Sequence, residues 1–121
     1  MSALVVLAVG LLGGLGAVAR FAVDGAVAGR MGRDFPYGTL VVNLSGSFVL
    51  GVLVGAALSD DAYRIAGTGL IGAYTTFSTW AFESHRLAED GELPLAALNF
   101  AVSLVLGVAV AWLGRELGGA L

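Results

Sequence analysis

Four long stretches of this 121-residue chain contain no charged residue, and this feature constrains the fold more than any other. The stretches are residues 1–19, 35–59, 65–82 and 93–114. Each meets or approaches the roughly 18–20 apolar residues that a helix needs to cross about 30 Å of hydrocarbon. The charged segments between them are too short to fold alone. We therefore expect one four-helix transmembrane domain over residues 1–121, with helices at about 3–28, 37–58, 62–86 and 94–115.

Composition argues against most soluble functions. Hydrophobic residues make up 58% of the chain and charged residues only 12%, whereas an ordinary soluble domain carries about 25% charged residues. A soluble globule of this size buries too little surface to hide so many apolar side chains. The net charge of −3 argues against a nucleic-acid partner. No cysteine and one histidine, His85, are present, and no catalytic constellation is evident, so we do not expect an enzyme.

The arginines give almost no signal for orientation. With four spans, Arg64 and Arg115 lie on the side of the termini, and Arg30, Arg33 and Arg86 lie on the other side. Two against three is almost no bias under the positive-inside rule. Such a balance allows insertion in both orientations and therefore an antiparallel dimer. A single fixed topology with weak signals is the alternative.

Small and polar residues recur at helical spacing within the uncharged runs. Small residues at this period let helix backbones approach closely in lipid. In the first run Gly10 and Gly14 form a G-x-x-x-G pair, and Gly16 and Arg20 lie one turn apart. Helix packing is the simplest role for these glycines. The stripe of the second run is Thr39, Asn43, Ser47, Gly51 and Gly55, and that of the fourth run is Asn99, Ser103, Gly107 and Ala111.

Two polar side chains need partners in this setting. Asn43 lies near the middle of a 25-residue uncharged run, where an amide costs several kcal/mol to bury unless it is paired or lines a wet path. Arg20 is nearer to a helix end, where its head can reach the interface. An ion pair with Asp24, four residues along, is its simplest role. Asn99, only five residues after Pro94, is expected near the interface.

The third run carries the sharpest signal. Its six consecutive residues from Thr75 to Trp80 are all hydroxylated or aromatic. Thr and Ser compete for backbone hydrogen bonds, and β-branched residues lose freedom in a helix. We expect the third helix to be broken here near mid-membrane, which is tolerated where the backbone is buried in protein or lines a cavity. A continuous helix, with hydroxyls bonded to the preceding turn, is the alternative.

Three motifs follow one another along the chain: GGLGAVARF at Gly13–Phe21, GTLVVNLSGSF at Gly38–Phe48 and GAYTTFSTW at Gly72–Trp80. Together they resemble the signatures of the Fluc (CrcB-type) fluoride channels, over essentially the whole chain. The resemblance implies passive, fluoride-specific efflux across the inner (plasma) membrane, which lowers intracellular fluoride toxicity. It also implies an antiparallel dual-topology homodimer with two pores, or a heterodimer with a paralogous chain.

The resemblance also assigns roles to individual residues. It implies a structural Na⁺, not transported, held at the dimer centre by backbone oxygens of Gly72 and Thr75 from each subunit. Arg20 would be the vestibule arginine. Neutral donors suit the pathway, because conduction needs sites that release the ion. The fluoride pathway implied in this way consists of Asn43, Phe77, Trp80, Thr76, Ser78, Thr79 and Ser103.

Two residues depart from the family pattern. Trp80 stands where phenylalanine is usual, and Asn99 where tyrosine is frequent. An aromatic ring edge attracts an anion weakly, and an indole N–H is a stronger donor. We therefore expect the Trp80 N–H to hold fluoride longer than phenylalanine would.

Two other functional classes stay open. A small multidrug-type, proton-coupled exporter needs an acid deep in the first span, and this chain has none before Asp24. A non-transporting membrane subunit would use the hydroxyls of the third run for packing alone. Passive fluoride efflux from vesicles, without a pH gradient, distinguishes the channel from both.

Overall fold

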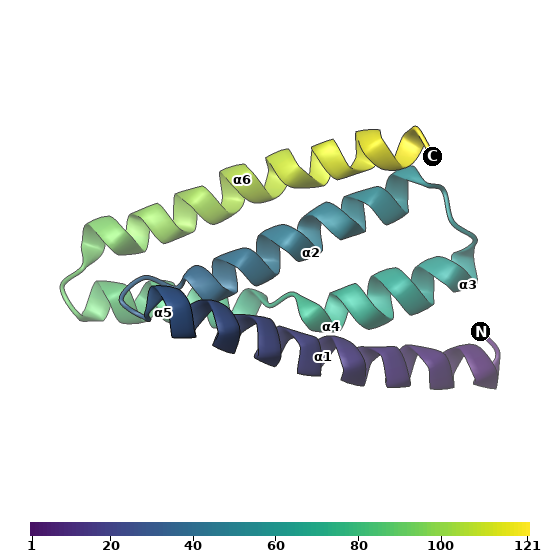
Figure 1. The fold of residues 1–121 in the computed structure, drawn as a ribbon, viewed down its shortest axis with the longest axis horizontal. Coiled ribbons are helices and arrows are strands. Elements are labelled where there is room, and N and C mark those ends of the chain that lie inside the picture. Colours follow the sequence, from purple (N-terminus) through teal and green to yellow (C-terminus); the bar gives the residue numbers. More distant parts are fainter.

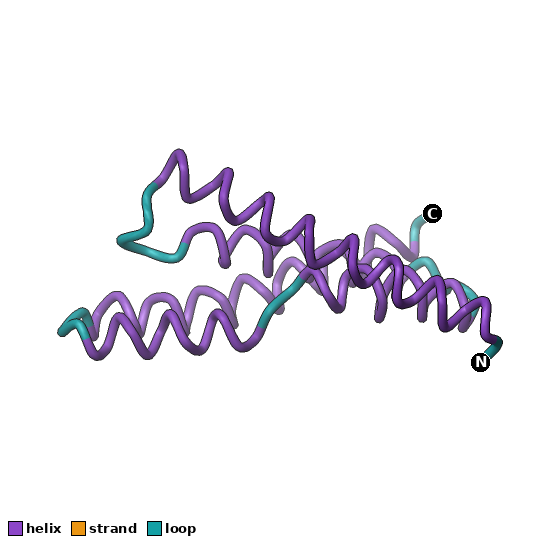
Figure 2. The backbone as a smooth tube through the Cα atoms, turned by 90° about the horizontal axis from the view of Figure 1, so that it is seen from below, coloured by secondary structure: helices purple, strands orange, loops and turns teal.

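The computed structural model describes all of residues 1–121 and is entirely helical (Figure 1). Three of its helices are long and unbroken, whereas the third predicted span consists of four consecutive pieces. The two chain ends lie at the same end of the molecule in both views (Figures 1 and 2), as an even number of passes requires. The elements are α1 (Ala3–Met31), α2 (Tyr37–Gly55), α3 (Asp60–Tyr63), the π-helix η1 (Arg64–Ile71), α4 (Gly72–Tyr74), α5 (Phe77–Glu89) and α6 (Leu93–Gly119).

Three of the helices, α1, α2 and α6, are long and apolar enough to cross a membrane. The segment over residues 60–89 is not one helix, because Thr75 and Thr76 interrupt it. The observed helix ends lie within four residues of the predicted ones. The first helix continues past the predicted end at residue 28 because Gly32, at φ 80°, is the residue that ends it, and glycine adopts this conformation without strain.

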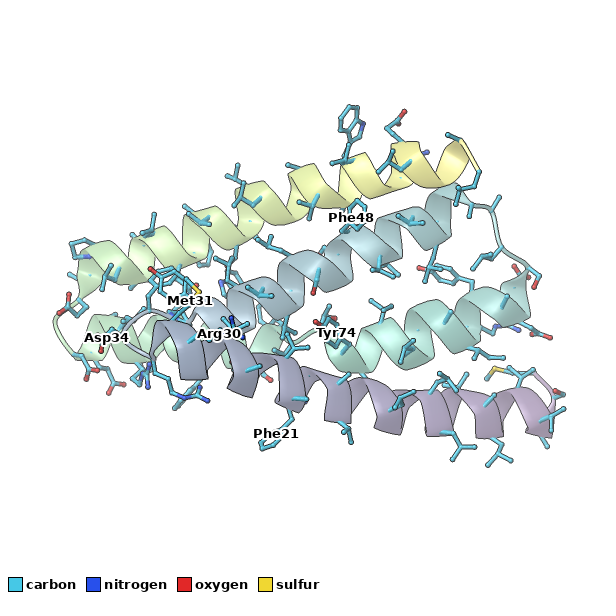
Figure 3. The ribbon with its side chains drawn as sticks, in the orientation of Figure 1. Phe21, Arg30, Met31, Asp34, Phe48 and Tyr74 are labelled. Atoms are coloured by element: carbon cyan, nitrogen blue, oxygen red, sulfur yellow. The ribbon has the colours of Figure 1, made fainter.

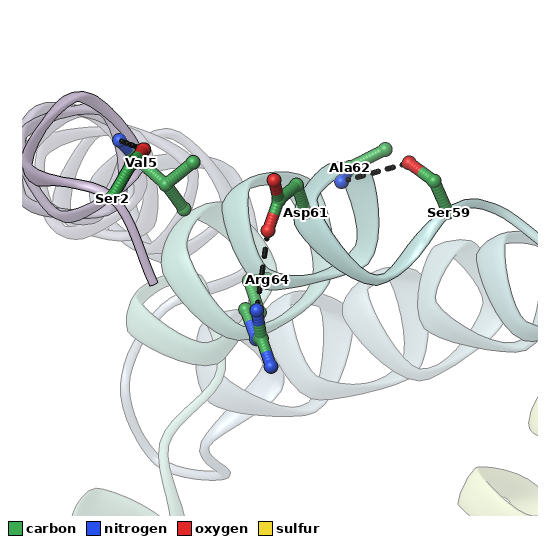
Figure 4. Close-up of polar contacts among 6 residues, drawn as sticks. All are labelled: Ser2, Val5, Ser59, Asp61, Ala62 and Arg64. Carbon is green, nitrogen blue, oxygen red and sulfur yellow. Dashed lines mark hydrogen bonds and ion pairs between the residues drawn. The ribbon is translucent and has the colours of Figure 1, made fainter.

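Short polar side chains start two of the helices at one end of the molecule (Figure 4). The Ser2 hydroxyl accepts a hydrogen bond from the Val5 N–H at 3.2 Å and caps α1. Ser59 caps α3 in the same way, accepting from the Ala62 N–H at 3.3 Å. These caps satisfy N–H groups that have no partner within the helix.

Glycines hold α2 and α6 in close contact. A Cβ added at Gly51 would overlap the Ala111 carbonyl, and one at Gly114 would overlap the Phe48 carbonyl. Backbones approach this closely only where both helices carry small residues. The predicted stripe of α2 is therefore confirmed at its glycines. The stripe of α6 is displaced, because Gly107 meets nothing within 4 Å.

The first helix packs on the third segment through Gly16, which was among the predicted small residues, and not through the G-x-x-x-G pair. Gly10 and Gly14 meet nothing within 4 Å, so the G-x-x-x-G pair makes no contact within the chain. Instead, a Cβ at Gly16 would overlap the Leu70 carbonyl, and one at Gly69 would lie 3.1 Å from the Val9 carbonyl oxygen. The glycines that matter are the ones that face η1.

Most large apolar side chains point outward. Only 18 of 121 residues are buried, and Phe21, which projects away from the bundle in Figure 3, is 82% exposed. A soluble protein of this size would collect such side chains in its core. The arrangement instead suits a chain whose outer surface contacts lipid or another protein subunit.

Candidate functional site

The predicted interruption of the third helix is present at Thr75 and Thr76 (the teal stretch between helical segments in Figure 2). Both residues have extended backbone conformations, with ψ 160° and ψ 120° respectively. Threonine favours this conformation because its branched Cβ crowds a helix. The Thr76 hydroxyl then accepts from the Thr79 N–H at 3.1 Å and caps α5. The chain therefore leaves and re-enters the helix within two residues.

The Asn43 side chain of α2 forms hydrogen bonds with both backbone groups of Thr76, in the interruption of the helix. Its Nδ2 donates to the Thr76 carbonyl at 2.9 Å, and its Oδ1 accepts from the Thr76 N–H at 2.8 Å. These bonds satisfy two backbone groups that the break would otherwise leave unpaired. An amide nitrogen carries two hydrogens, so one N–H of Asn43 stays available. Asn43 thus acts as a brace for the break as well as a donor.

A cavity of about 250 Å³ lies beside the break, between α2, α5 and α6. No charged side chain lines it. The Ser103 hydroxyl is buried there without any hydrogen-bond partner, which is rare for a buried polar atom. The lining residues are Asn43, Gly46, Ser47, Leu50, Thr75, Thr76, Phe77, Trp80, Ser103 and Leu104.

The structure brings together most of the predicted pathway residues. Asn43, Thr76, Phe77, Trp80 and Ser103 line this cavity. Thr79 lines a second cavity on the other side of Thr76, and Ser78 lines neither.

The second cavity, of about 150 Å³, contains Arg20 and Asp24, but these two side chains are not paired. Arg20 Nη1 donates to the Thr75 carbonyl at 3.4 Å, and Asp24 lies 3.5 Å from Arg33. The predicted Arg20–Asp24 pair is therefore wrong. Arg20 instead binds a carbonyl oxygen at the interruption of the third helix. Asp24 pairs with Arg33 because the turn after α1 places Arg33 beside it.

No role was predicted for Glu83 from the sequence, although it lies within the predicted third helix. It lies within α5, and its carboxylate accepts a 2.5 Å hydrogen bond from the Thr39 hydroxyl. Thr39 is 4% exposed, so this bond links α5 to the start of α2 at a site that is almost inaccessible to solvent. The sequence signal was available, because Glu83 lies one helical turn after Thr79 and Trp80.

The two residues that depart from the family pattern contact each other, and this corrects the expectation for Trp80. The Trp80 indole N–H donates to the Asn99 backbone carbonyl at 3.3 Å, so it is not free to bind an ion. Asn99 is 1% exposed, and its Nδ2 donates to the Ser84 hydroxyl at 2.8 Å. Ser84 is a second residue that the sequence analysis missed.

Backbone oxygens at the break are the groups that could hold a cation, since no cluster of three or more His, Cys, Asp or Glu side chains occurs. In a continuous helix the Thr76 N–H would donate to the Gly72 carbonyl, but here it donates to Asn43. The Gly72 oxygen therefore lacks its usual donor and suits a hard cation. The Thr75 oxygen fits less well, because it accepts from Arg20.

Comparison with known proteins agrees with the three sequence motifs. The family described as "CrcB-like protein, Camphor Resistance (CrcB)" matches residues 7–115. The chain is 58% identical, over 109 residues, to the Fluoride-specific ion channel FluC 2 of Mycolicibacterium paratuberculosis, covering 90% of this chain and 89% of that protein.

Two further relatives are similar over most of their length. The FluC 2 protein of Mycobacterium tuberculosis is 56% identical over 105 residues, which cover 87% of this chain and 83% of the relative. The FluC 1 protein of Leifsonia xyli is 46% identical over 123 residues, covering 98% and 90%. The predicted resemblance is thereby confirmed, and the chain belongs to the CrcB family as a multi-pass membrane protein.

Proposed function

We propose that this protein is a fluoride-specific ion channel. The observation that carries the proposal is the cavity beside the broken helix, which is lined by neutral donors and contains the buried, unpartnered Ser103 hydroxyl. The names of the relatives, which are described as fluoride-specific channels, support it.

The cavity has the chemistry that a small dehydrated anion requires. Moving a bare ion into hydrocarbon costs on the order of 20 kcal/mol by a Born estimate, so donors must replace its water. The free N–H of Asn43 and the O–H of Ser103 are such donors, and the edge of Phe77 adds weak positive potential. Because none of these groups is charged, each holds the ion loosely enough for it to leave.

Arg20 supplies the positive charge near the entrance. Its guanidinium lies in the second cavity, across Thr76 from the first, and contacts the Thr75 carbonyl. A cation in this position raises the local concentration of anions without lying in the cavity beside α6. We propose that fluoride passes from the second cavity along Thr79 and Thr76 to the first, and leaves the cell down its gradient through the inner membrane.

The proposed assembly is an antiparallel homodimer of dual topology, with Na⁺ at its centre. Backbone oxygens of Gly72 and Thr75 from both copies would hold the ion, supported by the missing helical donor at Gly72. Bound Na⁺ would supply a fixed positive charge between two anion pathways. Replacing Na⁺ by N-methyl-D-glucamine should then slow fluoride flux, and unchanged flux after complete exchange would remove Na⁺ from the proposal.

The channel is tested with purified protein in vesicles loaded with potassium fluoride. Valinomycin lets potassium follow, and an electrode records fluoride release, with potassium chloride vesicles in parallel. We expect rapid fluoride release without a pH gradient and little chloride release. Release no faster than from protein-free vesicles, or release that requires a pH gradient, would refute the channel.

One variant links the flux to the cavity. Ser103→Ala should slow fluoride release about tenfold, because it removes a buried donor that has no partner within the chain. Thr68→Ala is the control, since it removes an exposed hydroxyl on η1 that lines neither cavity. Equal rates in the two variants would place the pathway elsewhere.

A further inference from the structure

We infer that Ser84 and Asn99 are positioning residues that fix the Trp80 ring at the cavity wall, so that its N–H points away from the ion. This inference rests on the proposed function for its consequence, but the arrangement itself is a property of the fold. We call Trp80, Ser84 and Asn99 the tryptophan clamp.

Three hydrogen bonds close the clamp into a circuit. The Trp80 indole N–H donates to the Asn99 carbonyl at 3.3 Å, and the Asn99 amide donates to the Ser84 hydroxyl at 2.8 Å. The Ser84 hydroxyl in turn donates to the Trp80 carbonyl at 2.9 Å. The circuit therefore ties the ring of Trp80 to its own backbone through residues of two helices. Ring orientation and the α5–α6 spacing are set together.

The clamp lies where water cannot replace its bonds. Trp80 is 7% exposed and Asn99 is 1% exposed. Leaving a buried donor unpaired is costlier than the bond is worth in water, so the arrangement is strongly preferred over one in which the indole turns. A hydroxyl at residue 84 is the only link between the Asn99 amide and α5.

Aromatic neighbours hold the ring on its remaining sides. The Phe77 ring centre lies 5.3 Å from that of Trp80 at an interplanar angle of 67°, and Phe100 stacks on it at 5.0 Å and 25°. Both geometries are favourable for aromatic pairs. The ring is therefore held by two aromatic contacts and one hydrogen bond. Its N–H is occupied, so only ring carbon atoms of Trp80 can face the cavity.

The clamp has a direct consequence for transport. A free indole N–H would be a strong donor at the cavity wall and would hold fluoride, or a water molecule, longer. With the N–H occupied, Trp80 contributes only a weak ring edge, and release of the ion stays fast. Loosening the clamp should therefore slow fluoride release through Trp80, without any change to the Asn43 or Ser103 donors.

The experiment uses the full-length protein carrying Trp112→Phe, which removes an exposed tryptophan and leaves Trp80 as the only one. The variants are Ser84→Ala, which removes two of the three bonds and leaves the Trp80–Asn99 bond without their support, and Ser84→Thr, which keeps the hydroxyl. His85→Ala is the matched control, because this neighbour on α5 is exposed and outside the clamp. Trp80 fluorescence emission and fluoride release from vesicles are measured for each.

We expect Ser84→Ala to shift the Trp80 emission maximum and to slow fluoride release about tenfold, with Ser84→Thr and His85→Ala close to the parent. When Trp80 is also replaced by Phe, Ser84→Ala should have no further effect on release. An equal loss in both backgrounds, or an unchanged emission maximum, would overturn the inference.

Two further provisions keep the test decisive. Should Ser84→Ala fail to yield folded protein, Asn99→Leu removes the same amide–hydroxyl bond from α6 without leaving an unpaired amide, and the same outcomes apply. If the parent protein releases no fluoride at all, the proposed function fails. The emission of Trp80 in the Ser84 variants still decides whether the clamp exists.

Discussion

Replacing Asn43 by leucine tests whether the interrupted helix depends on its amide brace. The substitution keeps the side-chain size but removes hydrogen bonds of 2.9 and 2.8 Å to the carbonyl and N–H of Thr76. Interhelical hydrogen bonds in membrane proteins average about 0.6 kcal/mol each, which gives about 1.2 kcal/mol as a lower estimate. Two unpaired buried backbone groups at about 1–3 kcal/mol each give an upper estimate of about 6 kcal/mol.

The position of Thr76 decides between these estimates. Thr76 is 8% exposed and borders both cavities, so water there can take over part of the lost bonding. We therefore expect Asn43→Leu to lower the free energy of unfolding by about 2 kcal/mol. The measurement is unfolding by dodecyl sulfate in mixed micelles, followed by tryptophan fluorescence.

Ser47→Ala is the matched control for this experiment. Ser47 lies one turn further along α2 and lines the same cavity, and its hydroxyl has no hydrogen-bond partner within the chain. We expect a change of less than about 0.5 kcal/mol, because the half-buried Ser47 hydroxyl has no hydrogen bond to lose. If both variants lowered the free energy of unfolding equally, the bonds between Asn43 and Thr76 would not be what stabilises the break.

Two pairs of glycine substitutions test the helix contacts. Gly16→Ala should destabilise the fold by about 1–3 kcal/mol in the same unfolding assay, because its methyl group would overlap the Leu70 carbonyl. Gly25→Ala on the same helix, where nothing lies within 4 Å, should be neutral or stabilising by up to about 1 kcal/mol. Gly114→Ala should force α6 away from α2 at a similar cost, whereas Gly107→Ala should not. If the two variants of either pair lowered the free energy of unfolding equally, the packing described for that helix would be contradicted.

Local features of the chain were predictable from the sequence. The uncharged runs gave the helices, and the cluster of hydroxylated and aromatic residues gave the break at Thr75 and Thr76. Both inferences depend on residues that are neighbours in sequence. The polar cavity at Asn43 followed because an amide in the middle of a span needs a partner.

Contacts between helices were not predictable in the same way. Arg20 was expected to pair with Asp24 on its own helix, but a carbonyl from another segment is its partner. The Trp80 N–H was expected to be free, and it is occupied by the backbone of Asn99. Such partners depend on the rotation and axial offset of two helices, which a single sequence leaves undetermined. The glycines of α6 were misassigned for the same reason.

The division of the third span into short pieces has a consequence for biogenesis. The translocon releases a segment into lipid according to its own hydrophobicity, and residues 60–89 contain no single helix that is long and apolar enough to cross. We expect neighbours already in the bilayer to compensate, because Gly16 of α1 and Asn43 of α2 both contact this segment. The order of synthesis therefore suits the protein, because both receiving helices emerge from the ribosome before the segment that needs them.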